Sequence, residues 1–461
     1  MGMMSCKTLF EDTIAAIATA LGKAAIACVR VSGPQTREIL RALTNRELEP
    51  RKATLVPIFD PRTQELLDRA IAIFYASPES YTGEDMVEFF THGGFFVPQS
   101  VLKVVLEVGA RMALPGEFTK RALINGKLSL TQAEAVEALV EAKSSYQHKM
   151  AMNALEGELL PTLTPIRNAL IQIAAALNVE LDYPEEVTND TTQLLEELEK
   201  VRERVEALLR ASERTLKYQA GLEVVIAGKP NVGKSSLLNR FLEEDRAIVT
   251  EVPGTTRDTI TELVEVGGML LRITDTAGIR KATDRVERIG VERALRAVGK
   301  ADLILFVVDA SRSLDEDDHT ILKEIARLDK PHLVVINKID VVEMVDTEAI
   351  RKELGTDAHI VTISALRGEG LVELEHHLKE TIKELVGETS GATLINQRQV
   401  GTLRRCLSSI YGGIDALKAG YPNDIVAMEV RQAIETLDEL TGRNYTEDLL
   451  DTIFSTFCVG K

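Results

Sequence analysis

The residues with the most specific chemistry lie at positions 228–235, directly after the apolar run LEVVIA. They read GKPNVGKS and fit the pattern GxxxxGK[ST] between a strand and a helix. Such glycines let backbone N–H groups surround phosphate oxygens, and the helix N-terminus adds partial positive charge. We expect Lys234 to reach the outer phosphates and Ser235 to ligate Mg²⁺. The predicted phosphate site comprises Asn231, Val232, Gly233, Lys234, Ser235 and Ser236.

A second phosphate motif, DTAG, occupies positions 275–278 after the apolar run MLLRIT. We expect Asp275 to hold Mg²⁺ through water and the Gly278 N–H to contact the γ-phosphate. The remaining positions of this predicted contact are Thr276 and Ala277.

A base pocket is predicted from two more strand ends. Asn337 ends the run HLVVIN and is followed by Lys338 and Asp340, and Ser364 ends the run HIVTIS and is followed by Ala365. The Asp340 carboxylate can accept from the N1 and N2 hydrogens of guanine, a pattern that adenine does not offer. Asn337 can bond the other edge of the base while the Lys338 stem covers its face. Because the carboxyl ends of such strands share one ligand edge, the ordered motifs predict GTP rather than ATP.

The segment TEVPGTTRDTI, at 250–260, lies between the two phosphate motifs. Thr256, with Thr255 beside it, can complete the Mg²⁺ shell, and the alternative is a plain Gly/Thr turn. Ras-type enzymes place a water-orienting Gln directly after DxxG, and here that position is Ile279. Help with hydrolysis must therefore come from elsewhere. Asn231 could offer an amide oxygen to a monovalent cation, or it could be a structural loop residue.

The elements that position these residues differ along the chain. Residues 222–386 alternate apolar strands with helices, which predicts a doubly wound sheet, with a hairpin at Gly267–Gly268. Residues 1–123 mix short strands with a helix near 97–109 and indicate an α+β domain. The segments before and after the α/β part are helical, so we predict one helical domain with an α/β domain inserted. One helix face carries Leu194, Leu198, Val201, Val205 and Leu208, and helix breaks are expected at Pro161, Pro165 and Pro184.

Composition limits the class of protein. The 461 residues suffice for about three domains, with 45% hydrophobic and 27% charged residues. A net charge of −17 argues against a protein that binds nucleic acid over its whole surface. Residues 1–123 carry 14 basic and 14 acidic residues and are neutral. Four cysteines without a CxxC pair, and no apolar run long enough to cross a bilayer, predict a cytoplasmic protein that does not span a membrane.

Taken together, the motifs resemble the bacterial and organellar tRNA modification GTPases called MnmE or TrmE, over nearly the whole chain. The resemblance rests on GKPNVGKSS, PGTTRD, DTAGIR followed by DRVERIG, NKID and the final FCVGK. N-terminal matches are VRVSG, YTGEDMVEFFTHGG and PGEFTKRALINGKLSLTQAEA. The stretch ATALGKAAIACVRVSG departs from the family, which usually has a Pro/Gly/Arg-rich loop there.

The resemblance implies a multidomain α/β protein with four segments. These are a folate-binding-like dimerisation domain at 1–123, a helical domain at 124–220 and 387–461, and an inserted Ras-like P-loop G domain at 221–386. It also implies a homodimer, a flavin- and NADH-using partner with which it forms a heterotetramer, and tRNA as a further partner. The implied activity is K⁺-stimulated GTP hydrolysis, coupled to adding a folate-derived group to a wobble uridine.

Site residues follow from the same resemblance. It places K⁺ among Asn231, Thr250, Val252 and Thr255, with Thr250 also near the nucleotide. Glu287 would position the attacking water, although by itself it reads as a solvated helix-start carboxylate. A tetrahydrofolate derivative (5-formyl- or 5,10-methylene-) would contact Arg30, Glu88, Lys127 and Lys461. Cys458 would serve the modification chemistry, and its apolar neighbours leave a packed small hydrophobe as the alternative.

Two other functions stay open from the sequence. A ribosome-assembly or regulatory GTPase switch would have the same G motifs without modification chemistry, although the chain lacks a recognisable RNA-binding appendage. The N-terminal domain could also be a dimerisation module without a ligand.

Overall fold

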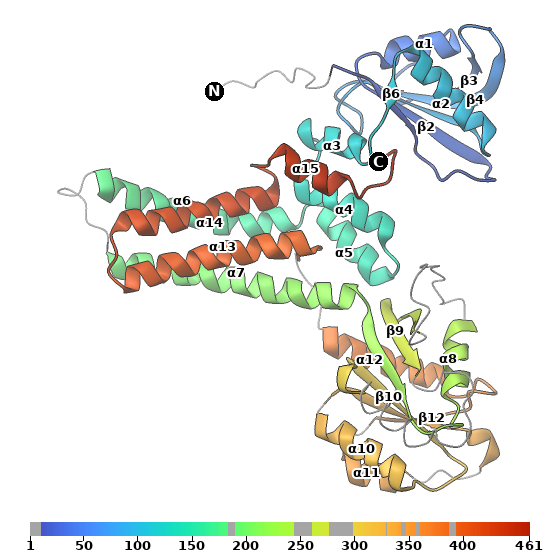
Figure 1. The fold of residues 1–461 in the computed structure, drawn as a ribbon, viewed down its shortest axis with the longest axis vertical. Helices are drawn as coiled ribbons and strands as arrows, with labels where there is room; N and C mark the ends of the chain where they lie inside the picture. The colour runs from blue at the N-terminus through green and yellow to red at the C-terminus, as the bar shows by residue number, and fades with distance from the viewer. Residues whose placement is uncertain are drawn as a thin grey trace. The chain divides into compact units, whose positions relative to one another are not determined.

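The computed structural model describes residues 11–182, 190–243, 261–275, 298–328, 330–342, 347–355, 359–386 and 393–461. The chain forms two compact units (Figure 1). The first comprises 1–137, 154–202 and 402–461, and the second comprises 138–153 and 203–401. Each unit has its own six-stranded sheet.

The sheet of the first unit has the order β3-β4-β5-β2-β1-β6. Its neighbours pair antiparallel, except that β1 and β6 run parallel. The strands are β1 (Ile14–Ile17), β2 (Ile26–Ser32), β3 (Thr54–Phe59), β4 (Leu66–Tyr75), β5 (Met86–His92) and β6 (Arg111–Met112). Alternate side chains point to opposite faces. One face packs under α1 (Thr36–Thr44) and α2 (Phe96–Val108), which confirms the helix expected near 97–109.

The other face of this sheet carries the predicted polar residues. Val29 and Val31 belong to the core, so Arg30 points away from it, and Arg30 lies opposite Glu88 in the register. Next to these strands, Ile14 and Ala16 pack against Phe118 of α3 (Glu117–Ile124). The sheet register therefore brings two residues 58 positions apart onto one surface.

Long helices make up the rest of the first unit. They are α4 (Leu130–Glu141), α6 (Leu159–Asp182), α7 (Thr191–Gln219), α13 (Gln397–Lys418), α14 (Asn423–Thr441) and α15 (Glu447–Phe454), of which α4, α7 and α13 extend into the second unit. Figure 1 shows α6 and α14 side by side, and Arg167 and Asp438 join them through two contacts of 2.6 and 2.8 Å. The predicted apolar face of α7 is confirmed, because all five of its residues are buried.

The helix breaks expected at Pro161 and Pro165 are wrong, because α6 runs through both. Pro161 lies in the first turn, where a backbone N–H has no acceptor within the helix and nothing is lost. Pro165 is inside the helix and removes only the bond to the carbonyl of Pro161. Pro184 lies outside the described residues.

The second unit is a doubly wound α/β domain with the sheet order β12-β11-β10-β7-β9-β8. Strands β7 (Leu222–Ala227), β9 (Met269–Asp275), β10 (Leu303–Asp309), β11 (His332–Asn337) and β12 (Ile360–Ile363) are parallel. Strand β8 (Thr261–Val266) pairs antiparallel with β9, which confirms the hairpin at Gly267–Gly268. The accompanying helices are α5 (Ser145–Leu155), α8 (Lys234–Glu243), η1 (Ile339–Val341), α10 (Glu316–Leu328), α11 (Glu348–Leu354) and α12 (Leu371–Val386).

The chain enters and leaves this α/β domain at neighbouring points. Arg214 and Tyr218 of α7 donate to the carbonyl of Leu385 at the end of α12, at 3.2 and 3.1 Å. A cation at a helix C-terminus satisfies carbonyls that lack partners within the helix. The Leu394 N–H then donates to the Ser212 hydroxyl (3.0 Å). Adjacent connections are what a domain inserted into a helical domain requires.

Candidate functional site

The phosphate motif forms the turn between β7 and α8. Gly228 and Gly233 have φ of +141° and +100°, and Asn231 has φ of +64°. A Cβ on Gly228 would lie 2.3 Å from the Val307 carbonyl oxygen, so only glycine fits there. Lys234 begins α8 and is buried, and its ammonium donates to the Gly228 carbonyl (2.7 Å). The turn thus places a cation at a helix N-terminus, where phosphate binding is favoured.

The side chain of Asn337 connects three loops at the carboxyl edge of the sheet. Its Nδ2 donates to the Val232 carbonyl (2.8 Å), and its Oδ1 accepts from the Ala365 N–H (2.9 Å). Asn337 is 2% exposed. These two hydrogen bonds hold the phosphate loop against the loop after β12, and the contact of the amide with the edge of the base stays a prediction.

The remaining base-pocket residues lie beside Asn337. The Ser364 hydroxyl donates to the Asp340 carboxylate (2.7 Å), and this hydrogen bond lowers the pKa of Asp340. The Lys338 ammonium donates to Asp309 (2.6 Å). Burial acts to raise the pKa of Asp309, but the hydrogen bond from Lys338 helps to lower it below its ordinary value. Both carboxylates are therefore ionised at neutral pH, as an acceptor for guanine N–H groups must be.

Sequence reasoning missed two residues that shape this pocket. Asp309 ends β10, and its position at the carboxyl end of a buried strand could have identified it. Arg240 on α8 donates from Nε to the Ala365 carbonyl (2.9 Å) and from Nη2 to the Leu366 carbonyl (2.6 Å). No local pattern marks Arg240, because its acceptors lie 125 and 126 residues away.

The other predicted residues of the nucleotide site lie at the end of β9, around the phosphate turn or outside the described residues. The side chain of Asp275 is not described, although its backbone ends β9. Ser235, Ser236 and Asn231 are exposed around the phosphate turn. The residues that lie outside the described part of the chain are Thr250, Val252, Thr255, Thr256, Thr276, Ala277, Gly278 and Glu287.

A second polar site lies on the outer face of the first unit's sheet. The Arg30 Nη2 lies 2.8 Å from a Glu88 carboxylate oxygen, and its Nη1 donates to the Gly460 carbonyl (3.0 Å). The rings of Tyr81 and Phe118 lie 5.6 and 5.5 Å from the guanidinium carbon, within cation–π range. Strand β2 and the C-terminal segment, 430 residues apart, thus meet at one guanidinium.

The other predicted residues of this site belong to α3 and the segments around it. Lys461 is partly buried, and burial together with the charge of Arg30 lowers its pKa. The Lys461 carbonyl oxygen accepts from the Phe118 N–H (3.1 Å). Lys127 is exposed and donates to the Pro78 carbonyl (3.0 Å). The structure therefore brings Arg30, Glu88 and the 458–461 segment together. The side chain of Lys127 instead contacts the loop 77–85, between β4 and β5.

Cys458 is exposed, so the alternative of a packed small hydrophobe does not hold. The core position belongs instead to its neighbour Phe457, which is buried with Phe454 and Leu450. Cys28 and Cys406 are buried, and burial raises the pKa of each thiol to about 12. Of the cysteines within the described residues, Cys458 alone presents its thiol to solvent.

The described ranges contain no group of three or more His, Cys, Asp or Glu residues arranged to hold a metal ion. Their helices include none with the length and apolar character needed to cross a membrane.

Comparison with known proteins gives two family matches. The family described as "GTP-binding protein TrmE N-terminus" matches residues 13–127, and the "MnmE helical domain" matches residues 130–458. The tRNA modification GTPase MnmE of Thermotoga maritima is 48% identical over 98% of this chain and 100% of its own length. The protein with that name from Staphylococcus epidermidis is 39% identical over 98% of this chain and 99% of its own. A structure of Aquifex aeolicus Era bound to GDP and AlF4⁻ is 32% identical over 41% of this chain and 66% of its own, with a TM-score of 0.29.

Proposed function

Because this chain belongs to the MnmE family of tRNA modification GTPases, we propose that it hydrolyses GTP to GDP and phosphate during the modification of tRNA. The observation that carries this function is the phosphate turn with buried Lys234, joined through Asn337 to the loop that holds Asp340 and Ser364. Ser235 lies in the first turn of α8, and its hydroxyl is the kind of oxygen ligand that Mg²⁺ prefers. Steady-state phosphate release from GTP, compared with ATP, tests the assignment.

We further propose that K⁺ stimulates hydrolysis, held by Asn231, Thr250, Val252 and Thr255, with Glu287 positioning the attacking water. The exposed Asn231 in its left-handed turn supports this, since its amide oxygen is available beside the phosphate loop. A cation there would neutralise charge that develops in the transition state. The test compares hydrolysis in KCl and in NaCl, for the wild type and for Asn231→Ala. Equal rates in the two salts would remove the K⁺ mechanism.

The N-terminal domain is proposed to bind a tetrahydrofolate derivative, 5-formyl- or 5,10-methylene-, through Arg30, Glu88, Lys127 and Lys461. A cation pair, Arg30 and Lys461, suits the glutamate tail, and the Glu88 carboxylate suits the donor edge of the pterin. When bound, this cofactor would supply the one-carbon unit for the aminomethyl-type group on the wobble uridine, with Cys458 exposed nearby for that chemistry.

Calorimetry with 5-formyltetrahydrofolate tests the folate site. We expect binding heat for the wild type and much weaker binding for Arg30→Met. Arg37→Met is the matched control, because Arg37 also pairs with a carboxylate, Asp85 (2.6 Å), and lies over a ring, Phe74 (4.6 Å). Absence of binding heat for the wild type would leave the domain as a dimerisation module.

We propose a homodimer that joins a flavin-dependent partner in a heterotetramer and acts on tRNA in the cytoplasm, with the domain division 1–123, 124–220, 221–386 and 387–461. The outer face of the N-terminal sheet supports self-association, because Leu55 and Ile71 are paired across β3 and β4 yet 62% and 45% exposed. Light scattering of Leu55→Glu tests the dimer. Two binding experiments separate this function from ribosome assembly: capture of a flavoprotein supports it, whereas co-sedimentation with ribosomal subunits supports ribosome assembly. A nucleoside profile of tRNA from a deletion strain tests the modification.

A further inference from the structure

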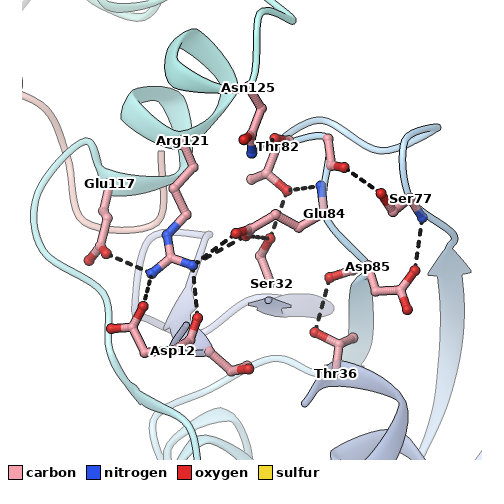
Figure 2. Close-up of polar contacts among 12 residues, drawn as sticks. Asp12, Ser32, Thr36, Ser77, Thr82, Glu84, Asp85, Glu117, Arg121 and Asn125 are labelled. Atoms are coloured by element: carbon pink, nitrogen blue, oxygen red, sulfur yellow. Dashed lines mark hydrogen bonds and ion pairs between the residues drawn. The ribbon is translucent and has the colours of Figure 1, made fainter. Parts of the chain in front are cut away.

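A charged cluster lies next to the Arg30 site (Figure 2). It is centred on the buried Arg121 of α3 and includes the buried Glu84 and Glu117 and the exposed Asp12. The Arg121 side chain is 0% exposed. Its guanidinium contacts Glu84 at 3.1 Å, Glu117 at 3.0 Å and Asp12 at 2.8 Å. The Ser32 hydroxyl adds a hydrogen bond of 2.8 Å to the other oxygen of Glu84. We call these five residues the Arg121 cluster.

The cluster joins elements that are separate in the sequence. Ser32 is the last residue of β2, Glu84 lies in the loop before β5, and Glu117 and Arg121 belong to α3. Figure 2 shows the carboxylates of Asp12, Glu84 and Glu117 around one guanidinium, with the Ser32 hydroxyl bonded to Glu84. Arg121 therefore fixes β2, the 77–85 loop and α3 relative to one another.

The same elements carry the proposed tetrahydrofolate residues. Arg30 lies two residues before Ser32 on β2, and Glu88 lies four residues after Glu84. Lys127 follows α3, and its backbone N–H donates to the Ala122 carbonyl at 2.8 Å. Each of these three residues is thus close in sequence to an element that Arg121 holds.

The fourth residue, Lys461, is held by the first turn of α3. The Phe118 N–H donates to the Lys461 carbonyl (3.1 Å), and the Gly116 N–H donates to the Cys458 carbonyl (3.4 Å). These backbone donors have no acceptor within the helix, so the 458–461 segment satisfies them. A shift of α3 would therefore move Lys461 and Cys458 together.

Side chains from α3 and the loop also orient Arg30 directly. Phe118 of α3 and Tyr81 of the loop place their rings against its guanidinium. The Tyr81 hydroxyl lies 2.9 Å from the Thr119 hydroxyl. The 77–85 loop and α3 are therefore joined by this contact near Arg30 as well as by the Arg121 cluster. The position of Arg30 depends on the relative placement of α3 and this loop.

A buried ion cluster is an expensive way to stabilise a domain, because desolvation of the charges opposes their attraction and apolar side chains often serve as well. Its planar guanidinium does, however, select one arrangement of the elements it joins, because Nη1 contacts Glu84 while Nη2 contacts Asp12 and Glu117. We propose that Arg121 is a positioning residue for the tetrahydrofolate site, which sets the relative placement of Arg30, Glu88, Lys127 and the 458–461 segment. This inference rests on the proposed folate function.

Two variants of the full-length chain test the inference. Arg121→Lys keeps the charge and removes the planar fork. Arg121→Met combined with Glu84→Gln removes one positive and one negative charge, so no single buried charge is left unpaired. The control is Arg167→Met with Asp438→Asn, which removes an arginine–carboxylate pair between α6 and α14. Circular dichroism and thermal unfolding report whether each variant is folded, because Arg121, Arg167 and Asp438 lie in the first unit and the GTP site lies in the second.

Two readouts are measured. The first is the dissociation constant for 5-formyltetrahydrofolate. The second is the mobility of a nitroxide attached to Cys458 in a Cys6→Ser background, in which Cys28 and Cys406 are buried and unreactive. We expect both Arg121 variants to bind roughly tenfold to a hundredfold more weakly, the range for residues that orient metal ligands from behind. We also expect a more mobile label in both, with the control variant and GTP hydrolysis unchanged.

Wild-type affinity and wild-type label mobility in folded Arg121 variants would overturn the inference. If the wild type itself binds no 5-formyltetrahydrofolate, the proposed folate function fails, and the nitroxide readout still decides whether Arg121 positions the 458–461 segment. An equal loss of affinity in the control variant would show a general stability effect and would also overturn the inference.

Discussion

Arg240 offers a sharp test of how the guanine pocket is built. Its guanidinium joins α8, which begins at the phosphate turn, to the carbonyls of Ala365 and Leu366. Replacement by alanine removes both hydrogen bonds and leaves the loop after β12 held by the Asn337–Ala365 contact. Because Arg240 contacts loop carbonyls, we expect the change to weaken binding of the base and to leave the chemical step unaltered.

The size of the effect follows from the two bonds. A hydrogen bond from a charged donor contributes about 1.5–3 kcal/mol when buried, and the Nη2 bond here is exposed. We therefore expect a loss of about 1–2 kcal/mol, which corresponds to a roughly 5- to 30-fold weaker affinity. The KM for GTP should rise by a similar factor while kcat stays the same.

The assay is the dissociation constant for a fluorescent GDP analogue, together with steady-state hydrolysis. Arg240→Lys should recover part of the affinity, since one donor can still reach a carbonyl. Arg367→Ala is the control, because Arg367 is an exposed arginine of the same loop whose ion pair with Glu369, at 3.9 Å, contributes little. Wild-type affinity for folded Arg240→Ala, or a fall in kcat at unchanged KM, would refute the reasoning.

Three other changes have defined outcomes. Gly460 has φ of +99°, and a Cβ there would lie 2.9 Å from the backbone of Ala18. Gly460→Ala should therefore displace the C-terminal segment and increase the mobility of a nitroxide label on Cys458. An unchanged nitroxide spectrum would count against this expectation. The Glu265 carboxylate accepts a hydrogen bond from the Ser145 N–H (3.0 Å) at the start of α5. Glu265→Ala should therefore speed hydrogen exchange in the first turn of α5. The control Glu223→Gln, which removes an exposed ion pair to Arg272, should leave that exchange rate unchanged. Because burial and Arg30 lower the pKa of Lys461, its ammonium loses its proton at a lower pH than an ordinary lysine. Affinity for the anionic 5-formyltetrahydrofolate should therefore fall as pH rises into the alkaline range. Lys461→Arg should remove that fall, because arginine keeps its charge. If calorimetry gives the same pH profile for the wild type and Lys461→Arg, the assignment is contradicted.

Local spacing determined much of the nucleotide site from the sequence alone. The phosphate turn depends on glycines that tolerate positive φ, and the structure has Gly228 and Gly233 in that conformation. The parallel strands are continuous apolar runs because both faces are buried, and β10 is buried along nearly its whole length. The Gly267–Gly268 turn likewise fixed the hairpin of β8 and β9. Each of these features is encoded within a few residues.

The tertiary structure decided which polar groups meet. Arg30 reaches the Gly460 carbonyl across 430 residues, and the Arg121 cluster draws on Asp12, Glu84 and Glu117. Helical spacing accounts only for Glu117 and Arg121, an i,i+4 pair on α3. No periodicity predicts the other contacts, because a long side chain has many rotamers and its partners depend on how distant elements pack. For the same reason the hydrogen bonds of Asn337 to the loops that contain Val232 and Ala365 were not predicted from its place in NKID. The backbone conformations that glycine and apolar patterns impose were readable from the chain, and the hydrogen bonds between distant segments became visible only when those segments were packed together.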